Sequence, residues 1–147
     1  MSIFKDCDFR GVYGEDLGEQ EMAAIGAAVA RLLEGRSIVV GGDFRIHTPS
    51  LKQAFIRALL ENGAEVWDIG QISTPQLYFS KRHLQTYASA QITASHNPPK
   101  YNGLKLMLGD LPVRPEDIET IGRMAEAILR TSSGKIHTQS GDTLPAV

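Results

Sequence analysis

The stretch "QITASHNPPKYNGLKLML", residues 91–108, joins two strand-like runs through a polar turn. An apolar run ends here, a polar cluster with Ser95 and His96 follows, two prolines stiffen the exit, and a second apolar run begins at Leu104. The connection is too short for a helical crossover, so the two runs are predicted to be antiparallel strands. A plain hairpin does not need a serine beside a histidine, so the question is what Ser95 does at this turn.

Outward from this stretch, helical and strand-like segments alternate. Amphipathic periodicity, prolines in first helical turns and an Asn-Gly stop predict helices over residues 19–33, 48–62, 74–81 and 115–130. Apolar and β-branched runs predict strands over residues 37–43, 64–70, 87–93 and 103–108. This alternation predicts the α/β class, as a three-layer α/β/α sandwich with a mostly parallel mixed sheet. Ligands gather beyond the carboxyl ends of such strands, where Asp43, Arg45 and Ser95 would lie.

Composition narrows the class of protein. The 147 residues are 42% hydrophobic and 22% charged, which is ordinary for one soluble domain. A formal charge of −2 gives no general attraction to nucleic acid, and no apolar run approaches the roughly 20 residues of a membrane span. The N-terminus lacks the apolar core of a signal peptide, and the single Cys7 excludes an internal disulfide. We therefore expect a cytoplasmic protein with no nucleic-acid partner and no membrane partner.

The residues around Ser95 suit a phosphate. His96 can donate to an anion, Asn97 can tie the turn to its own backbone, and Lys100 and Lys105 bring positive charge to the same corner. A phosphoserine carries about −1.5 to −2 charges and needs such partners. The same composition also fits an ordinary turn with a solvated histidine, so the residues alone leave both interpretations open.

Other chemistries fit less well. A Ser-His-Asp hydrolase would need a nucleophile elbow, and no G-x-S-x-G is present. A zinc site is disfavoured because the 4 histidines lack ligand spacing. Asp43 and Arg45 are interpreted as an internal ion pair that braces a strand end, in preference to a functional pair. Taken alone, Lys105 would be an ordinary surface lysine, and Arg10 would pair with a carboxylate such as Asp8 or stay solvated.

Three segments carry a resemblance to a known family. They are "TASHNPPKYNGLKL" (93–106), "FKDCDFRGVYGEDL" (4–17) and residues 39–80. The first resembles the phosphoserine loop of the α-D-phosphohexomutases, which include phosphoglucomutase and phosphomannomutase. The second resembles their N-terminal F-R-x-Y-D-x-R-G motif, and the third their G-x-D-x-R strand end with the helix and P-T-P connection that follow. The resemblance implies the family's first domain over residues 1–135, with 136–147 as a polar C-terminal exit or tail.

In that family the loop serine donates its phosphoryl group to a hexose 1-phosphate, and the bound 1,6-bisphosphate reorients and returns the other phosphate. The resemblance implies this role for Ser95, with His96 as the loop histidine, Lys105 in proton transfer or electrostatic support, and Arg10 lining the site. Arg10, Asn97 and Lys105 are expected to bind substrate. The implied parent is an isomerase of carbohydrate metabolism, an intramolecular phosphotransferase acting on hexose phosphates with glucose 1,6-bisphosphate as activator.

Two differences from the family pattern bear on what this chain does alone. Cys7 stands where the N-terminal motif usually has tyrosine. The family's second domain supplies a D-x-D-x-D-R loop that holds Mg²⁺ beside the phosphoserine, and nothing here matches it, so in this chain only Ser95 would touch the metal, through its phosphate. We therefore expect an isolated first domain that is inactive alone and works with the remaining domains of a longer parent. The alternative is a non-catalytic module, derived from a mutase domain, that binds phosphosugars or a protein.

Overall fold

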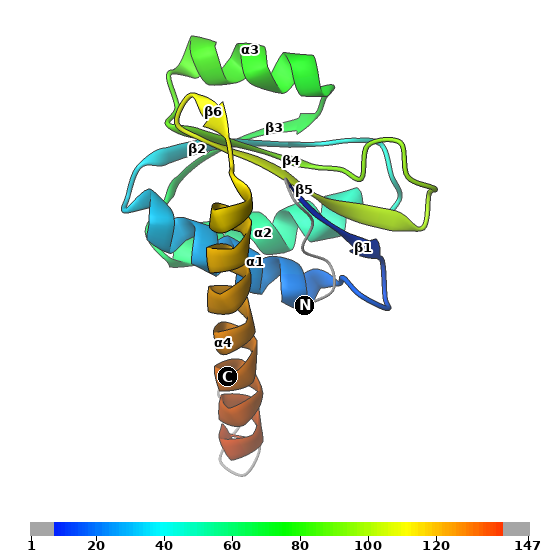
Figure 1. Ribbon diagram of the computed structural model, residues 1–147, viewed down its shortest axis with the longest axis vertical. Helices are drawn as coiled ribbons and strands as arrows, with labels where there is room; N and C mark the ends of the chain where they lie inside the picture. The colour runs from blue at the N-terminus through cyan, green and yellow to red at the C-terminus, as the bar shows by residue number, and fades with distance from the viewer. Residues whose placement is uncertain (1–7, 140–147) are drawn as a thin grey trace.

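The computed structural model describes residues 8–139 of the chain, with side chains over residues 8–131. Helices and strands alternate over most of this length (Figure 1). The strands are β1 (Phe9–Val12), β2 (Ser37–Gly42), β3 (Glu65–Gln71), β4 (Ala88–Ile92), β5 (Tyr101–Leu108) and β6 (Leu111–Pro112). The helices are α1 (Glu19–Leu33), α2 (Thr48–Glu61), α3 (Thr74–Leu84) and α4 (Pro115–Gln139). Only β1 and β6 were not predicted, because both are too short to show a periodic pattern.

One mixed sheet joins the strands in the order β1-β5-β4-β2-β3, with β6 beside β5. β2 runs parallel to both β3 and β4, whereas β5 runs antiparallel to β4, β1 and β6. The antiparallel pairing of β4 with β5 is the one predicted from the short connection, and its register sets Ile92 opposite Leu104. The α/β class with a mixed sheet is therefore confirmed, and its parallel part consists of β3, β2 and β4.

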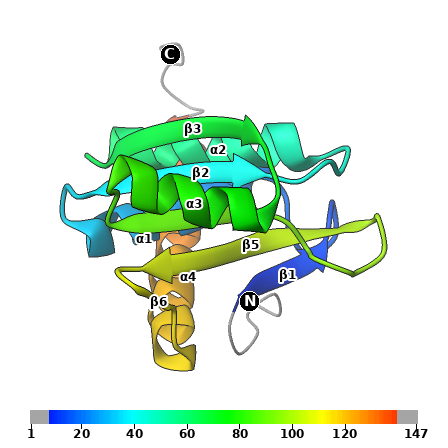
Figure 2. The same cartoon turned by 90° about the horizontal axis from the view of Figure 1, so that it is seen from above.

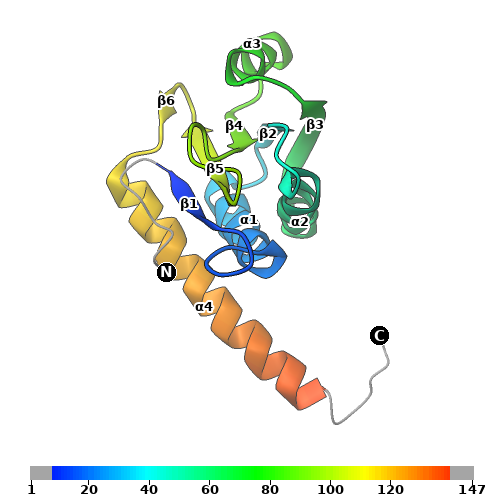
Figure 3. The same cartoon turned by 90° about the vertical axis from the view of Figure 1, so that its right-hand side faces the viewer.

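Helices cover both faces of the sheet. α1 and α2 lie on one face and α3 lies on the other, so the sheet is the middle of three layers (Figures 2 and 3). α4 packs against α1 and extends away from the sheet along the long axis of the molecule (Figure 1). Within residues 8–139, none of the helices is long and apolar enough to cross a lipid bilayer.

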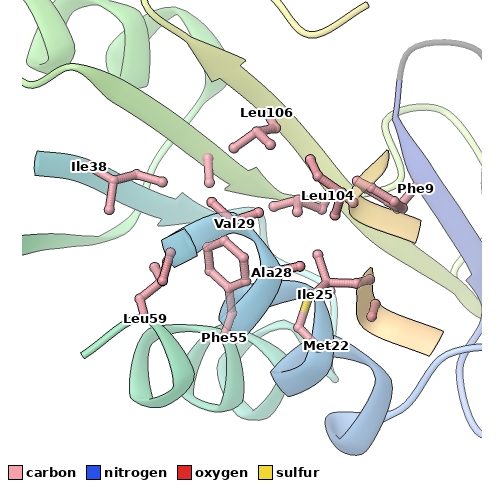
Figure 4. Packing of buried hydrophobic residues seen from close by; sticks show 14 of the residues in the cluster. Phe9, Met22, Ile25, Ala28, Val29, Ile38, Phe55, Leu59, Leu104 and Leu106 are labelled. Atoms are coloured by element: carbon pink, nitrogen blue, oxygen red, sulfur yellow. The ribbon is translucent and has the colours of Figure 1, made fainter. Parts of the chain in front are cut away.

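The core lies between the sheet and the layer formed by α1 and α2 (Figure 4). Ile25 of α1 and Phe55 of α2 are fully buried there, together with Leu104 of β5. Complete burial of a large apolar side chain stabilises the fold by about 1.5–3 kcal/mol. Leu104 and Leu106 belong to this core, so strand alternation turns the intervening Lys105 toward the α3 side of the sheet.

The first turns of α2 and α3 differ from the prediction. Thr48 does not cap α2, because its hydroxyl donates to the carboxylate of Asp43 at 2.7 Å instead. Ser73, rather than Thr74, caps α3, because the Ser73 hydroxyl accepts a hydrogen bond from the backbone N–H of Gln76. The side chain of Thr48 therefore stabilises the segment after β2 rather than the first turn of α2.

α4 is longer than predicted. The polar "TSSG" after Arg130 is expected to end the helix, but α4 continues to Gln139. The Thr131 hydroxyl donates to the carbonyl of Ala127 at 3.0 Å, so this polar side chain is satisfied without leaving the helix. The predicted tail over 136–147 therefore begins inside a helix, and residues 140–147 lie outside the described residues. The domain boundary after residue 135 stays a prediction.

Candidate functional site

The predicted site forms where two parallel strands end. β2 and β4 are neighbours, so the segments that leave their carboxyl ends lie side by side. The backbone N–H of Asp43, just after β2, donates to the carbonyl of Ile92 at the end of β4, at 3.1 Å. Residues 93–100, which we call the Ser95 loop, connect β4 to β5. The sheet therefore brings Asp43 and Arg45 to the Ser95 loop.

Ser95 is exposed and has a backbone conformation that is rare for serine. Its φ is 55°, in the left-handed region, which costs about 1–2 kcal/mol for a residue with a side chain. Its N–H donates to the hydroxyl of Thr93 at 3.0 Å, and the N–H of Asn97 donates to the carbonyl of Ala94 at 3.0 Å. Strained residues that the surrounding structure holds in place cluster at active sites. Ser95 fits that description.

Asp43 anchors the base of the loop. Its carboxylate accepts hydrogen bonds from the hydroxyls of Thr93 and Thr48, each at 2.7 Å, and pairs with Nε of Arg45 at 3.0 Å. Burial alone would raise the pKa of Asp43, but the hydrogen bonds from Thr93, Thr48 and Arg45 outweigh burial and hold the pKa below its ordinary value. The interpretation of Asp43 and Arg45 as an internal ion pair at a strand end is confirmed.

Arg45 also binds the loop backbone. Its Nη2 donates to the carbonyl oxygens of Ser95 at 2.6 Å and Asn97 at 2.9 Å. Its Nη1 donates to the carbonyl oxygens of Pro98 at 2.8 Å and Tyr101 at 3.2 Å. One guanidinium group thus binds four carbonyls that lie 50 to 56 positions away in sequence.

A second ionic group lies on the α3 side of the sheet. Nε of Arg10 pairs with Asp8 at 3.0 Å, and its Nη1 donates to the side-chain oxygen of Asn97 at 3.1 Å. Nζ of Lys105 lies 3.9 Å from the other carboxylate oxygen of Asp8. Asp8 is buried, whereas Lys105 keeps 43% of its side chain exposed. The buried carboxylate of Asp8 therefore holds Arg10 and Lys105 together, and Arg10 connects this pair to Asn97.

Thr93 and Ala94 at the base of the Ser95 loop are buried, whereas most of the loop after Ser95 is exposed. His96 follows Ser95 at the surface, and Lys100 is exposed at the end of the loop. The backbone N–H of Tyr13 donates to the carbonyl of Lys100 at 2.9 Å, which ties the loop to the segment after β1. Cys7, where the family pattern has tyrosine, lies outside the described residues.

Tyr13 belongs to a small cluster that braces the neighbouring helices. Its ring stacks on His47, with centroids 3.7 Å apart and planes 8° apart. The hydroxyls of Tyr13 and Ser50 donate to the same oxygen of Glu19, at 2.6 and 2.7 Å. These two bonds lower the pKa of Glu19, and the bond to Glu19 raises the pKa of Tyr13. We assign this cluster a structural role, because it joins the start of α1 to the start of α2.

Two hollows flank the site. One, of about 460 Å³, lies beside the Ser95 loop and is lined by Asp43, Phe44, Arg45, Ile46, Asn97 and Pro99. The other, of about 260 Å³, lies between α3 and the sheet and is lined partly by Ser89 and Lys105. Small-molecule sites have volumes of about 300–1,000 Å³. The hollow beside the loop has that size.

The described residues do not complete a metal site. No group of three or more His, Cys, Asp or Glu side chains that could hold a metal ion occurs among them. The carboxylates of the site, Asp8 and Asp43, are already bonded to cations and hydroxyls. Hard cations such as Mg²⁺ need several oxygen ligands. These residues therefore do not fit Mg²⁺ by themselves.

Sequence reasoning missed the residues that hold the site together. It considered Asp8 only as a possible partner of Arg10, and it gave Thr48 and Thr93 no role in the site. One signal was available for Asp8, because it lies two positions before Arg10 and can pair with it locally. The threonines carry no such signal, since their bonds to Asp43 depend on how β2, β4 and α2 meet in space.

Comparisons with known proteins find relatives over most of the chain. The family model for phosphoglucomutase/phosphomannomutase, alpha/beta/alpha domain I, matches residues 1–131. A phosphomannomutase of Escherichia coli is 44% identical over 107 residues, which are 73% of this chain and 24% of that protein. A phosphomannomutase of Klebsiella pneumoniae is 43% identical over 107 residues, which are 73% of this chain and 68% of that protein.

A solved structure shares the fold. A phosphoglucomutase/phosphomannomutase family protein from Burkholderia thailandensis matches with a TM-score of 0.73 and 30% identity, over 86% of this chain and 30% of that one. The chain thus spans about a quarter of the length of the E. coli relative, 24%. On the family match over residues 1–131, the chain belongs to the phosphoglucomutase/phosphomannomutase family, of which it contains the α/β/α domain I.

Proposed function

We propose that this chain is the phosphoryl-carrying domain of a phosphohexomutase, and that Ser95 is the residue that carries the phosphoryl group. The proposal rests on Ser95 itself, which is exposed at a φ of 55° on a loop whose backbone is bound by Arg45. The relatives named phosphomannomutase support the class of reaction. The substrates of the parent enzyme would be hexose 1-phosphates and hexose 6-phosphates.

The reaction proceeds as two exchanges of one phosphoryl group. The 6-hydroxyl oxygen of a hexose 1-phosphate attacks the phosphorus on Ser95, a bond from that oxygen to phosphorus forms, and the bond from phosphorus to the serine Oγ breaks. The hydroxyl loses its proton and Oγ gains one, so the protons balance. We assign this proton movement and the stabilisation of charge to His96 and Lys105. Transfer of the 1-phosphate back to Ser95 completes the cycle and releases hexose 6-phosphate.

Arg10 and Asn97 complete the substrate contacts in this proposal. A guanidinium group has five N–H donors, and the bonds from Arg10 to Asp8 and Asn97 fix its plane. With 35% of its side chain exposed, Arg10 can present further N–H groups to a phosphate. Phosphoryl transfer depends mainly on such positioning and charge neutralisation. We assign Mg²⁺ only a contact with the phosphate on Ser95, completed by other domains of the parent.

Transfer of labelled phosphate tests the proposal. The 147-residue chain is incubated with Mg²⁺ and ³²P-labelled glucose 1,6-bisphosphate, and the label that stays on the denatured protein is counted. We expect label on the wild type, because loading of Ser95 is only half of the mutase cycle, and on the control Ser80→Ala, which removes a half-buried hydroxyl of α3. We expect none on Ser95→Ala. Equal labelling of Ser95→Ala would refute the role of Ser95, and binding of the bisphosphate without transfer would favour a non-catalytic module.

A further inference from the structure

We infer that Arg45 is a positioning residue for phosphoryl transfer, because it holds the Ser95 loop in the shape that presents the serine. The inference rests on the proposed function of Ser95. Arg45 has only 14% of its side chain exposed, and its donors go to protein oxygens. It therefore acts through the loop backbone and not by touching the substrate.

The geometry suits a guanidinium group and no other side chain. Its five N–H donors point in fixed directions within one plane. In Arg45, Nε donates to Asp43 at 3.0 Å. The two terminal nitrogens donate to three carbonyls of the loop and to the carbonyl of Tyr101. A lysine offers one ammonium on a flexible stem and cannot bind four divergent oxygens at once. Asp43 orients the guanidinium plane of Arg45, and the four bonds from its terminal nitrogens hold the loop.

The same bonds prepare the loop for negative charge. A phosphoserine carries about −1.5 to −2 charges, which a free carbonyl oxygen nearby would repel. The carbonyl oxygens of Ser95 and Asn97 accept hydrogen bonds from Arg45 at 2.6 and 2.9 Å, so a cation offsets the partial negative charge of both. The carbonyl bonds also oppose relaxation of the φ of 55° at Ser95. Loss of Arg45 would remove both effects together.

Hydrogen exchange tests whether Arg45 holds the loop. The amides of Asn97 and Tyr101 donate within the loop, to the carbonyls of Ala94 and Pro98, each at 3.0 Å. In Arg45→Gln we expect both amides to exchange about tenfold faster, the loss that follows when one net hydrogen bond is removed. Arg57→Gln is the matched control, since Arg57 is exposed on α2, and it should leave both rates unchanged. Unchanged exchange in Arg45→Gln would overturn the inference.

The rate of Ser95 labelling tests whether that hold matters for transfer. In Arg45→Gln we expect the labelling rate at saturating bisphosphate to fall about a hundredfold, the effect of misplacing a reacting group by an ångström. The bisphosphate concentration for half-maximal rate should stay near that of wild type, because Arg45 does not contact the ligand. Arg45→Lys keeps the charge beside Asp43, so its labelling rate should lie between those of the wild type and Arg45→Gln. It also replaces Arg45→Gln if that variant fails to fold.

The outcomes distinguish failure of the positioning role of Arg45 from failure of the proposed function. Faster exchange with an unchanged labelling rate would show that Arg45 holds the loop for stability alone, and this would overturn its positioning role. A higher bisphosphate concentration for half-maximal rate, with an unchanged saturating rate, would mean that Arg45 contributes to ligand binding. This result would also contradict the inference. No label on the wild type would refute the proposed function for this chain, and the exchange measurement would still decide whether Arg45 holds the loop.

Discussion

At the scale of single residues, the polar groups around Ser95 satisfy one another in a closed network. Thr93 bonds both the carboxylate of Asp43 and the N–H of Ser95, and Asp43 in turn orients Arg45. Hydrogen bonds to charged groups are worth about 1.5–3 kcal/mol each, roughly twice a neutral one. Such a network can hold a strained serine at the surface, where an unsupported turn would relax.

The strain at Ser95 predicts an unusual response to glycine. Glycine adopts a positive φ freely, which removes about 1–2 kcal/mol of strain, and it costs about 0.5–1 kcal/mol in backbone entropy. We therefore expect Ser95→Gly to raise the free energy of unfolding by about 0.5–1 kcal/mol, although it abolishes labelling. Ser95→Ala, which keeps the side-chain clash, should show no such gain. Urea unfolding of the two variants distinguishes these outcomes, and equal stability would mean that the φ of 55° is not strained in solution.

The lowered pKa of Asp43 predicts a dependence of stability on acid. Because the folded pKa lies below the ordinary 3.8, ionised Asp43 contributes stability that is fully present above that value. This contribution is lost as the pH falls below 3.8 and through the folded pKa. Asp43→Asn should cost about 1.5–3 kcal/mol near neutral pH, because it weakens charge-assisted hydrogen bonds. Urea unfolding from neutral to acid pH should show the gap to wild type narrowing, and a constant gap would contradict the assignment.

Contacts between residues close in the sequence could be predicted, whereas most contacts between residues far apart in the sequence could not. The pairing of Asp43 with Arg45 spans two positions and was predicted. The bonds from Arg45 to the loop span 50 or more positions and leave no local pattern. Asp8 is intermediate, because its pairing with Arg10 was considered while its contact with Lys105 depends on β1 pairing with β5.

At the scale of elements, the site depends on a rigid support beneath the sheet. α1 and α2 pack closely under β2 and β4, the strands whose ends carry Asp43 and the Ser95 loop (Figure 4). Gly26 of α1 lets the helices approach, since a Cβ there would lie 2.7 Å from the carbonyl oxygen of Phe55 and 3.1 Å from Cβ of Ala58. The contact is partly with backbone, so a larger residue would push the helices apart.

This close approach predicts the sign of a helix substitution. Glycine to alanine inside a helix ordinarily stabilises by about 1 kcal/mol. At Gly26 we expect the opposite, a loss of about 1–3 kcal/mol from overpacking. Ala23→Gly in the same helix is the control and should show the ordinary cost of about 1 kcal/mol. Urea midpoints of both variants measure this, and a stabilised Gly26→Ala would mean that α1 and α2 are less tightly packed than described.

Elements were easier to predict than their ends and their neighbours. The helices and the longer strands follow from apolar periodicity, and the antiparallel β4–β5 pair follows from a short connection. The cap of α2 was wrong because Thr48 bonds Asp43 instead of its own helix. β1 was missed because "FRGV" has no period of its own and becomes a strand only by pairing with β5.

At the scale of the whole molecule, the sheet places the Ser95 loop beyond the ends of its parallel strands and two cations on the face beside it. Asp43, Arg45 and the Ser95 loop lie beyond the ends of β2 and β4, while Arg10 and Lys105 lie on the α3 side. Domain I therefore holds the proposed phosphoryl carrier and part of its charge compensation. The chain spans 24% of the E. coli relative, so we assign the remaining contacts to sugar and metal to other parts of the parent.

Intact-mass measurement with peptide mapping shows directly whether Ser95 carries the phosphoryl group. The chain is measured as purified and again after incubation with glucose 1,6-bisphosphate and Mg²⁺. We expect one added phosphoryl group, located on Ser95 in the mapped peptide and absent from Ser95→Ala. An unchanged mass after incubation, or a phosphoryl group located on a neighbouring hydroxyl such as that of Thr93, would contradict it.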